Sequence, residues 1–500
     1  MSGEAGRTPQ GAEKALSLLS TLESDLQENK LSDSERTKFL SDLKVIGRNP
    51  ADASPIFAKD GTSTLCRYAF ETSTSLASRE AMRCLANAML LNEPTRQIVL
   101  DLGCAPKAAE RMKTDDRDDE FLTSRILFFA TYTAKLDISV LFEKHSLAES
   151  ITSNLERAVK RLEAGSPSTP IIDLAFQETL KLIYNLTYYS PESATSLQPA
   201  LTPLVTLLLK TPLPTPPLQP PITHLINALL NLNPSPSQIE DSTLRDPFFP
   251  PHSPDLLTTH LTSLLEASFP QAPSASDDAL LSPLLSLLRT LHATAPRDVQ
   301  QSLRTSLLPS EASRSQALGK DPSLPSRLLR TAASPSTSTL RDIASALLFE
   351  LSSSSAQELI QNIGYGYAIG ILTRLGVDAP PSALAGAGSS SAGTGAGAGG
   401  DGEEGAGGER EGVNPITGQR LNAERTTEDM ERVQREIDNM TEEEKEREAE
   451  RLFVLFERLK ATGVVDVVNP VEMMMRNGGA GAGEGQGGSG TGARVEEVDE

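Results

Sequence analysis

The residues that could carry chemistry in this sequence do not form a catalytic pattern. The five histidines lack the H-x-x-x-H or H-E-x-x-H spacing of a metal site, and no G-x-S-x-G nucleophile motif occurs. We interpret the histidines as ordinary surface or loop residues: His145, His224, His252, His260 and His292. Three cysteines lie singly, which predicts reduced and mostly buried thiols: Cys66, Cys84 and Cys104. We therefore predict no metal, no cofactor and no enzyme activity; an enzyme would need a site that the sequence does not show.

Three further stretches resemble nucleotide- or calcium-binding motifs but do not match them. Residues 364–370 read G-x-G-x-x-x-G, one residue longer than the dinucleotide fingerprint, and they follow a predicted helix where that fingerprint needs a strand. Gly319-Lys320 is followed by an aspartate, so it is not a P-loop. The acidic run 115–120 lacks the geometry of a calcium loop, and we interpret it as a solvated connector at the start of a helix.

A recurring pattern of bases and asparagines is the strongest candidate for a binding site. Two helical blocks place a base four residues before an asparagine, and a third block carries two asparagines: Arg83 and Asn87, Lys181 and Asn185, Asn227 and Asn231. Asn185 and Asn231 are 46 residues apart, and Asn87 and Asn185 are 98 apart, about twice that distance. A period in the forties is typical of armadillo/HEAT repeats. Two interpretations stay open: the asparagines bind the backbone of a ligand in the groove of such an array, or they only cap and crosslink helices.

Amphipathic helices are the elements that would position this pattern. Between residues 14 and 378, leucine-rich blocks of roughly 10–18 residues alternate with Pro/Ser/Thr/Asp-rich breaks, without sustained period-2 alternation. The clearest blocks are Glu35–Ile46, Ser78–Leu91, Phe121–Tyr132, Phe176–Tyr188, Thr223–Leu232, Ala279–Leu291 and Leu340–Leu351. Proline-rich stretches in 190–340 are interpreted as long loops between helices. The predicted fold class is all-α, an armadillo/HEAT-like superhelix.

A separate C-terminal segment follows the helical blocks. Composition predicts a flexible N-terminus at 1–13, a disordered Gly/Ala/Ser linker at 379–412 and a disordered acidic tail at 476–500. Residues 413–475 are predicted to be organised around an amphipathic helix at 441–459, which begins with a Thr441–Glu444 capping box. Its apolar stripe consists of Leu452, Phe453, Phe456 and Leu459. The stripe is a self-association seam, a cap on the last repeats or a second clamp on a partner.

The charge balance restricts the partners. A formal net charge of −21 argues against nucleic acid and against an anionic membrane surface, and it favours a basic partner or a basic patch on one. Aromatic residues make up 4% of the chain and tryptophan is absent, which is low for a carbohydrate-binding or base-stacking protein. The sequence shows neither a signal peptide nor an apolar run of membrane-spanning length, so we expect a soluble, cytoplasmic protein.

Four stretches resemble the synembryn family, the cytosolic chaperones and nucleotide exchange factors of heterotrimeric G-protein α subunits. They are 414–418 with the segment from Met440 onward, 348–351 leading into 364–372, 43–48, and 83–87 with 100–103. Together they extend from about residue 35 to 470, and their order and spacing make the match specific. The Pro/Ser-rich middle departs from the animal members of the family.

The resemblance implies a superhelix whose concave face holds the C-terminal helix of a Gα subunit, GDP-bound or nucleotide-free. In the family, basic residues meet the terminal carboxylate and asparagines meet the backbone. Carried over, and continued along the repeat pattern, these residues are Lys44, Arg48, Arg83, Asn87, Lys181, Asn185, Asn227 and Asn231. An acidic protein can hold a local basic groove because the Debye length is only about 8 Å at physiological salt. The resemblance further implies a monomer that Gα recruits to the cell cortex or plasma membrane. The alternative is a generic armadillo scaffold or adaptor that binds peptide segments.

Overall fold

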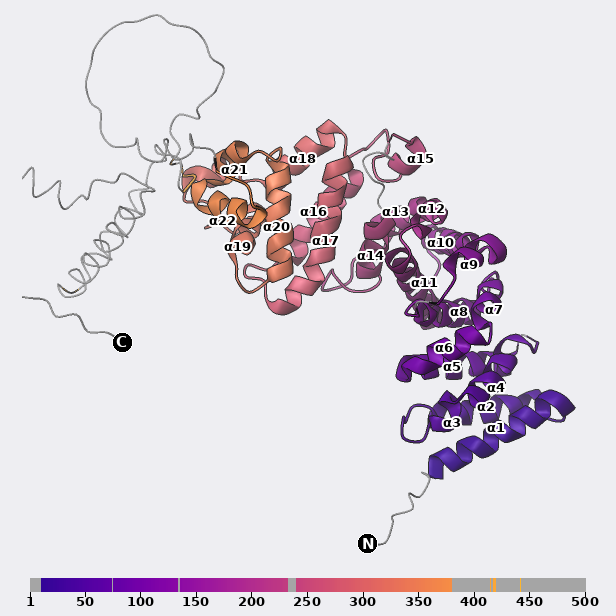
Figure 1. Cartoon of the computed structure of the whole chain (residues 1–500). Coiled ribbons are helices and arrows are strands. Elements are labelled where there is room, and N and C mark those ends of the chain that lie inside the picture. Colours follow the sequence, from indigo (N-terminus) through magenta and orange to yellow (C-terminus); the bar gives the residue numbers. More distant parts are fainter. Residues whose placement is uncertain are drawn as a thin grey trace, which may run out of the picture.

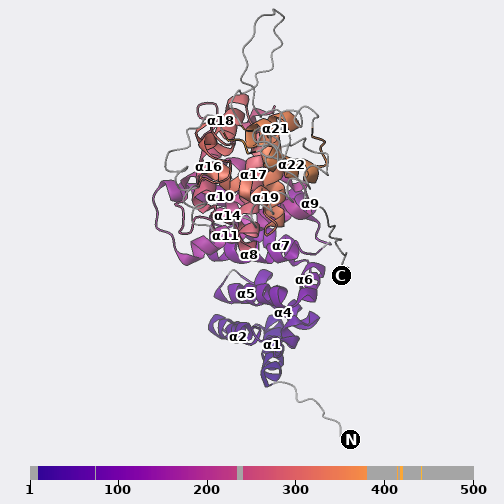
Figure 2. The ribbon, with the colours of Figure 1, turned by 90° about the vertical axis from the view of Figure 1, so that its left-hand side faces the viewer.

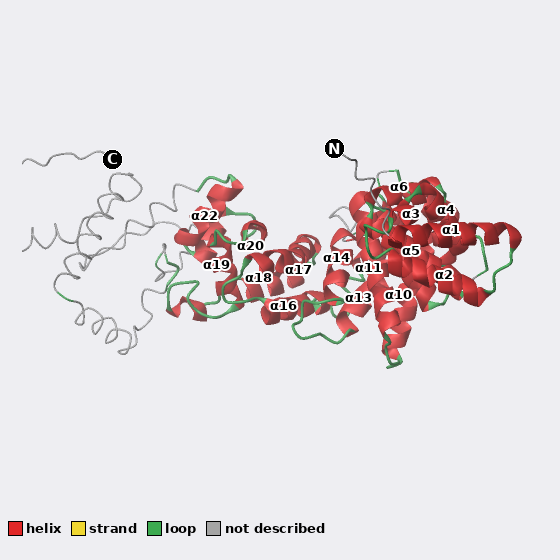
Figure 3. Cartoon of the chain, turned by 90° about the horizontal axis from the view of Figure 1, so that it is seen from below, coloured by secondary structure: helices red, strands yellow, loops and turns green. Residues whose placement is uncertain are grey.

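The computed structural model describes residues 10–73, 75–133, 135–232, 240–379, 414, 417–419 and 441. Every regular element in these ranges is a helix. The helices stack into an elongated, curved array with α1 at one end and α22 at the other (Figure 1). Coloured by secondary structure, the described part contains helices and loops only (Figure 3). The predicted all-α superhelix is confirmed.

The first half of the array contains eleven α-helices. Their bounds are α1 Gln10–Glu28, α2 Asp33–Ile46, α3 Ser54–Phe57, α4 Lys59–Phe70, α5 Leu76–Leu91, α6 Glu93–Asp101, α7 Cys104–Arg111, α8 Arg117–Ala130, α9 Ile138–His145, α10 Leu147–Glu163 and α11 Pro170–Tyr189. Turned by 90°, the structure shows α2, α5 and α8 following one another along the array (Figure 2).

The second half of the described array contains eleven more α-helices and two 3₁₀ turns. Their bounds are α12 Ser193–Ser196, η1 Gln198–Ala200, α13 Leu201–Lys210, α14 Ile222–Leu232, α15 Ser242–Arg245, α16 Leu256–Ser268, α17 Ala275–Thr294, α18 Arg297–Leu307, η2 Ala312–Ser315, α19 Leu324–Ala333, α20 Ser338–Leu351, α21 Ala356–Ile363 and α22 Tyr365–Leu375. The proline-rich stretches of this region, such as 211–221, lie between helices.

Seven helices pack one against the next along the array, and we call them the helix ladder: α2, α5, α8, α11, α14, α17 and α20. All seven coincide with the seven blocks predicted from leucine periodicity, although most begin a few residues earlier. Other helices flank the ladder; α4 packs on α5, α13 on α14 and α19 on α20.

Apolar spacing explains why the flanking helices fold onto the ladder. In α10 the buried side chains Leu147, Ile151, Leu155 and Ala158 recur every three or four residues and form one face. Burying each large aliphatic side chain contributes about 1.5–3 kcal/mol, so the face fixes how the helix packs.

Side-chain caps fix several helix starts. The Ser32 hydroxyl accepts from the Glu35 N–H, and the Glu35 carboxylate accepts from the Ser32 N–H, which forms a complete capping box at α2. The acidic run 115–120 also lies at a helix start, because the Asp116 carboxylate accepts from the Asp119 N–H at α8. Its interpretation as solvated is wrong for the last two residues, however, since Asp119 is buried and paired with Arg79 of α5, and Glu120 is buried and paired with Arg117 of α8 itself.

The ends of the array differ from the sequence-based boundaries. The first helix begins at Gln10, before the predicted start of the array at residue 14, and the last described helix ends at Leu375. The predicted linker from 380 onward and the predicted helix 441–459, apart from Thr441, lie outside the described residues, as does its stripe of Leu452, Phe453, Phe456 and Leu459. No helix in the described ranges combines the length and apolar character needed to cross a membrane.

A short segment from beyond the linker is docked at the C-terminal end of the array, and we call residues 414 and 417–419 the clasp. Buried Arg314 donates from Nη1 to the Gly418 carbonyl (3.1 Å) and from Nη2 to the Asn362 carbonyl (2.9 Å). The Leu318 N–H donates to the Thr417 carbonyl at 3.2 Å. The clasp therefore returns the chain to the last repeats after more than thirty intervening residues.

Candidate functional site

The predicted basic residues of the first ladder helices are joined by shared carboxylates. Lys44 of α2 lies 2.5 Å from Glu80 of α5, and Arg83 of α5 lies 2.8 Å from the other oxygen of the same carboxylate. Arg83 also reaches Asp118 of α8 at 2.5 Å. One network of ion pairs thus crosses three ladder helices, and each of these two bases already has a partner within the chain.

A second cluster of charged side chains, from α5, α7 and α8, is more deeply buried. Arg79 of α5 and Arg111 of α7 both donate to Asp119 Oδ1 at 2.9 Å. Burial of Asp119 opposes ionisation, but the hydrogen bonds from the two arginines outweigh burial and lower the pKa of this carboxyl below its ordinary value. Asp119 therefore remains charged and holds α5, α7 and α8 together.

Arg48 differs from the other predicted bases. It lies just beyond the end of α2, its side chain is exposed, and it forms no ion pair with any residue in the described ranges. Its guanidinium is therefore open to a ligand without first breaking an internal ion pair.

The predicted lysine of α11 lies in a mixed ionic and aromatic setting. Glu178 is buried, and its Oε1 accepts from Arg125 of α8 at 2.7 Å and from Lys181 at 2.5 Å. The Lys181 ammonium also lies 5.3 Å from the centre of the Phe128 ring, within cation–π range. The Lys181 ammonium thus contacts both the Glu178 carboxylate and the Phe128 ring.

The four predicted asparagines divide into two kinds. Asn185 donates to the Thr131 hydroxyl at 2.9 Å, and Asn231 donates to the Tyr184 carbonyl at 3.3 Å, so both crosslink neighbouring parts of the ladder. Asn87 and Asn227 are half-buried, and neither amide is hydrogen-bonded to another described residue. A role in ligand binding stays a prediction for all four, and only Asn87 and Asn227 leave their amides open to a partner.

An exposed aromatic patch beside these residues was missed by sequence reasoning. The tyrosine patch, as we call it, consists of Tyr132, Tyr184, Tyr188 and Tyr189. Neighbouring rings are 5.1–5.7 Å apart, and Tyr132, Tyr188 and Tyr189 are 44%, 59% and 49% exposed. Arg96 lies 5.3 Å from the Tyr132 ring centre. Aromatic rings on a surface, with arginine among them, are characteristic of protein-binding sites. The Tyr188-Tyr189 pair at the end of a helical block was the available signal.

The histidines and cysteines play no part in this site. Three histidines lie on packed helices and not, as expected, at the surface or in loops: His224, His260 and His292. Burial lowers the pKa of each, which favours the neutral imidazole. The three cysteines are free and buried, as predicted. No group of three or more potential ligands in the described ranges could hold a metal ion. The arrangement can bind a partner through charge and stacking.

Comparisons with known proteins agree with the resemblance. The family model of the guanine nucleotide exchange factor synembryn matches residues 39–479. A synembryn-like chaperone of Schizosaccharomyces pombe is 30% identical over 198 residues, which cover 40% of this chain and 35% of the relative. Chaperone Ric-8 of Drosophila pseudoobscura is 29% identical over 211 residues, 42% of this chain and 34% of its own. Chaperone Ric-8A of Macaca fascicularis is 23% identical over 473 residues, 88% and 83% of the two chains. The chain thus spans only about a third of the length of the first two relatives.

Proposed function

This chain belongs to the synembryn family of guanine nucleotide exchange factors, and on that premise we propose that it is an exchange factor and folding chaperone for heterotrimeric G-protein α subunits. It binds the C-terminal helix of Gα along the helix ladder and stabilises the nucleotide-free state. It acts in the cytoplasm and at the cell cortex, where Gα resides. No covalent chemistry is involved.

Two observations together support the proposal: the chain belongs to this family, and its ladder helices carry groups that are open to a peptide helix. Exposed Arg48 at the end of α2 offers a cation for a terminal carboxylate. The half-buried amides of Asn87 and Asn227 offer partners for backbone groups. The tyrosine patch at the ends of α8 and α11 offers apolar contact area, and fixing its rings on binding costs little side-chain entropy.

The mechanism is a competition between nucleotide and exchange factor for the folded state of Gα. Drawing the C-terminal helix out of the Gα domain removes packing beneath the guanine site, so GDP leaves and nucleotide-free Gα is held. GTP binding restores the domain and expels the exchange factor. The coupling is negative and reciprocal. Binding of this chain lowers the affinity of Gα for GDP by the same ratio by which GDP lowers the affinity of Gα for this chain. The same grip shields apolar surface of a nascent Gα.

A GDP-release assay with purified Gα subunits tests the proposal. The wild-type chain should accelerate GDP release from at least one member of a Gα panel, and Lys44→Glu with Arg48→Glu should abolish the acceleration. Because Lys44 is paired with Glu80, the single Arg48→Glu variant is the sharper test. It should lower affinity for nucleotide-free Gα about tenfold or more without lowering the melting temperature.

Arg297→Glu is the matched control. Arg297 is exposed, lies at the first residue of α18 outside the ladder, and forms no ion pair in the described part of the chain. If Arg48→Glu and Arg297→Glu both bind Gα like the wild type, the assignment of this surface is wrong. A chain that captures peptides with basic motifs but no Gα would instead be a general scaffold.

A further inference from the structure

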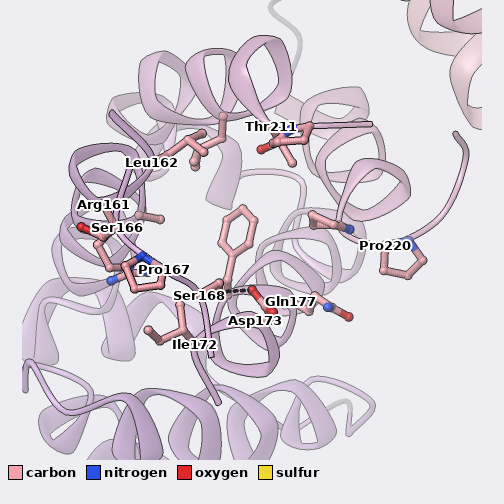
Figure 4. A pocket seen from close by; sticks show the side chains of 15 residues that line it. Arg161, Leu162, Ser166, Pro167, Ser168, Ile172, Asp173, Gln177, Thr211 and Pro220 are labelled. Atoms are coloured by element: carbon pink, nitrogen blue, oxygen red, sulfur yellow. Dashed lines mark hydrogen bonds between the residues drawn. The ribbon is translucent and has the colours of Figure 1, made fainter. Parts of the chain in front are cut away.

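A cavity of about 410 Å³ lies between α10, the first turns of α11, and α13 (Figure 4). This volume falls within the range of small-molecule sites. One part of its wall is apolar and is formed by Leu162, Ile172, Phe176, Leu207, Pro212 and Pro221. The remaining wall carries polar side chains, including Arg161, Ser166 and Gln177.

Arg161 gives the cavity its charge. Its guanidinium is half-buried and makes no ion pair with another described residue, whereas nearby Arg157 is paired with Asp115 at 3.0 Å. Burial, followed by the like charge of Arg117, lowers the pKa of Arg161 below its ordinary value. The carboxylates of Glu120 and Asp173 attract the guanidinium, but neither forms an ion pair with it, and Glu120 is paired with Arg117.

Asp173, the one carboxylate of the lining, attracts Arg161 without forming an ion pair with it. Asp173 accepts a hydrogen bond from the Ser168 hydroxyl and is exposed, so water screens its charge. Figure 4 shows the hydrogen-bonded Ser168–Asp173 pair, with Arg161 labelled beside Ser166. The guanidinium of Arg161 therefore forms no ion pair with a described carboxylate and is available to an anionic ligand.

We propose that this cavity is a binding site for a small organic anion with an apolar body, whose acidic group pairs with Arg161 while its body lies against Phe176 and the proline rings. A guanidinium pairs with a carboxylate through charge-assisted hydrogen bonds, and the apolar wall favours a ring over a hydrated inorganic ion. The site is independent of the proposed contact with Gα, and its test requires no G protein.

Isothermal titration of the full chain with naphthalene-2-carboxylate tests the proposal, and naphthalene-2-carboxamide serves as the neutral probe of the same shape. The carboxylate should bind one site per chain, at least tenfold more tightly than the carboxamide. Arg161→Gln should remove this preference and leave carboxamide binding unchanged. Arg297→Gln, which removes an exposed charge elsewhere, should retain the preference.

A second variant keeps the test decisive if Arg161→Gln does not fold. Ser166 lies on the exposed loop that borders the cavity, so Ser166→Trp should fold and should block both probes. Equal affinities for carboxylate and carboxamide, a preference that persists in Arg161→Gln, or undiminished binding in Ser166→Trp would each overturn the proposal. Absence of saturable binding by the wild-type chain would overturn it as well.

Discussion

At the scale of single residues, Asp25 of α1 is the point where the N-terminal helices meet. Its carboxylate accepts from Arg36 Nε at 2.6 Å, from the Tyr68 hydroxyl at 2.7 Å and from the Leu31 N–H at 2.6 Å. These partners come from α2, α4 and the α1–α2 turn. Burial alone would raise the pKa of Asp25, but the hydrogen bond from Arg36, followed by those from Leu31 and Tyr68, lowers it to about 2.

The lowered pKa of Asp25 predicts a specific loss of stability in acid. Because the folded-state pKa lies below the unfolded value of about 3.9, the charged carboxylate stabilises the fold above pH 4, and this contribution is lost as the pH falls through 2. Between pH 5 and pH 2 the free energy of unfolding should fall by about 2 kcal/mol more in the wild type than in Asp25→Asn, measured by urea denaturation. Asp298→Asn, an exposed change on α18, should follow the wild type. Parallel curves for all three proteins would contradict this role for Asp25.

The residue types of the candidate site were predictable from the sequence, whereas their pairing was not. Spacing indicated Arg83 and the family resemblance indicated Lys44, but no local pattern shows that Glu80 lies between their side chains. The contact with Asp118 joins residues 35 positions apart and depends on how α5 packs against α8. The full extent of the tyrosine patch was missed for the same reason, because Tyr132 meets Tyr189 only when α8 and α11 lie side by side.

At the scale of elements, leucine periodicity predicted the helix ladder well because each ladder helix buries one regular apolar face. Short helices such as α6 and α7 were not predicted, since eight or nine residues hold too few apolar positions to show a period. The clasp was indicated only as part of a family resemblance. Its docking depends on Arg314, which is about a hundred residues away in the sequence.

The clasp predicts an effect of substitution at Gly418. This residue has a φ of +69°, and an added Cβ would lie 2.5 Å from Leu318 Cδ1, so Gly418→Val introduces both backbone strain and a steric clash. We expect release of the segment, seen as at least tenfold faster hydrogen exchange at the Leu318 amide, which donates to Thr417 in the docked state.

Gly165→Val is the matched control for the clasp. Gly165 has a φ of +61°, and an added Cβ there meets nothing within 4 Å, so the variant carries similar backbone strain at a remote position without the clash. Exchange at Leu318 should be unchanged in this variant. Unchanged exchange in Gly418→Val would show that the clasp does not protect that amide.

At the scale of the whole molecule, the clasp changes how a C-terminal truncation must be designed. A chain ending at residue 412 loses both the clasp and the predicted helix 441–459, whereas a chain ending at residue 422 keeps the clasp residues 414–419. Both shortened chains retain the buried ladder, so both should give helical circular dichroism spectra like that of the wild type. Their comparison separates anchoring of the array end from any contact made by the later helix.

We expect the two truncations to differ in stability but to agree in activity. The chain ending at 412 should melt at a lower temperature, because Arg314 loses its Gly418 acceptor and keeps a buried charge with fewer hydrogen bonds. If the stripe of Leu452, Phe453, Phe456 and Leu459 clamps Gα, both chains should accelerate GDP release much less than the full chain. Full activity of the chain ending at 422 would exclude the later helix from exchange. Full activity of both would assign the whole reaction to the helix ladder and leave the clasp a purely stabilising role.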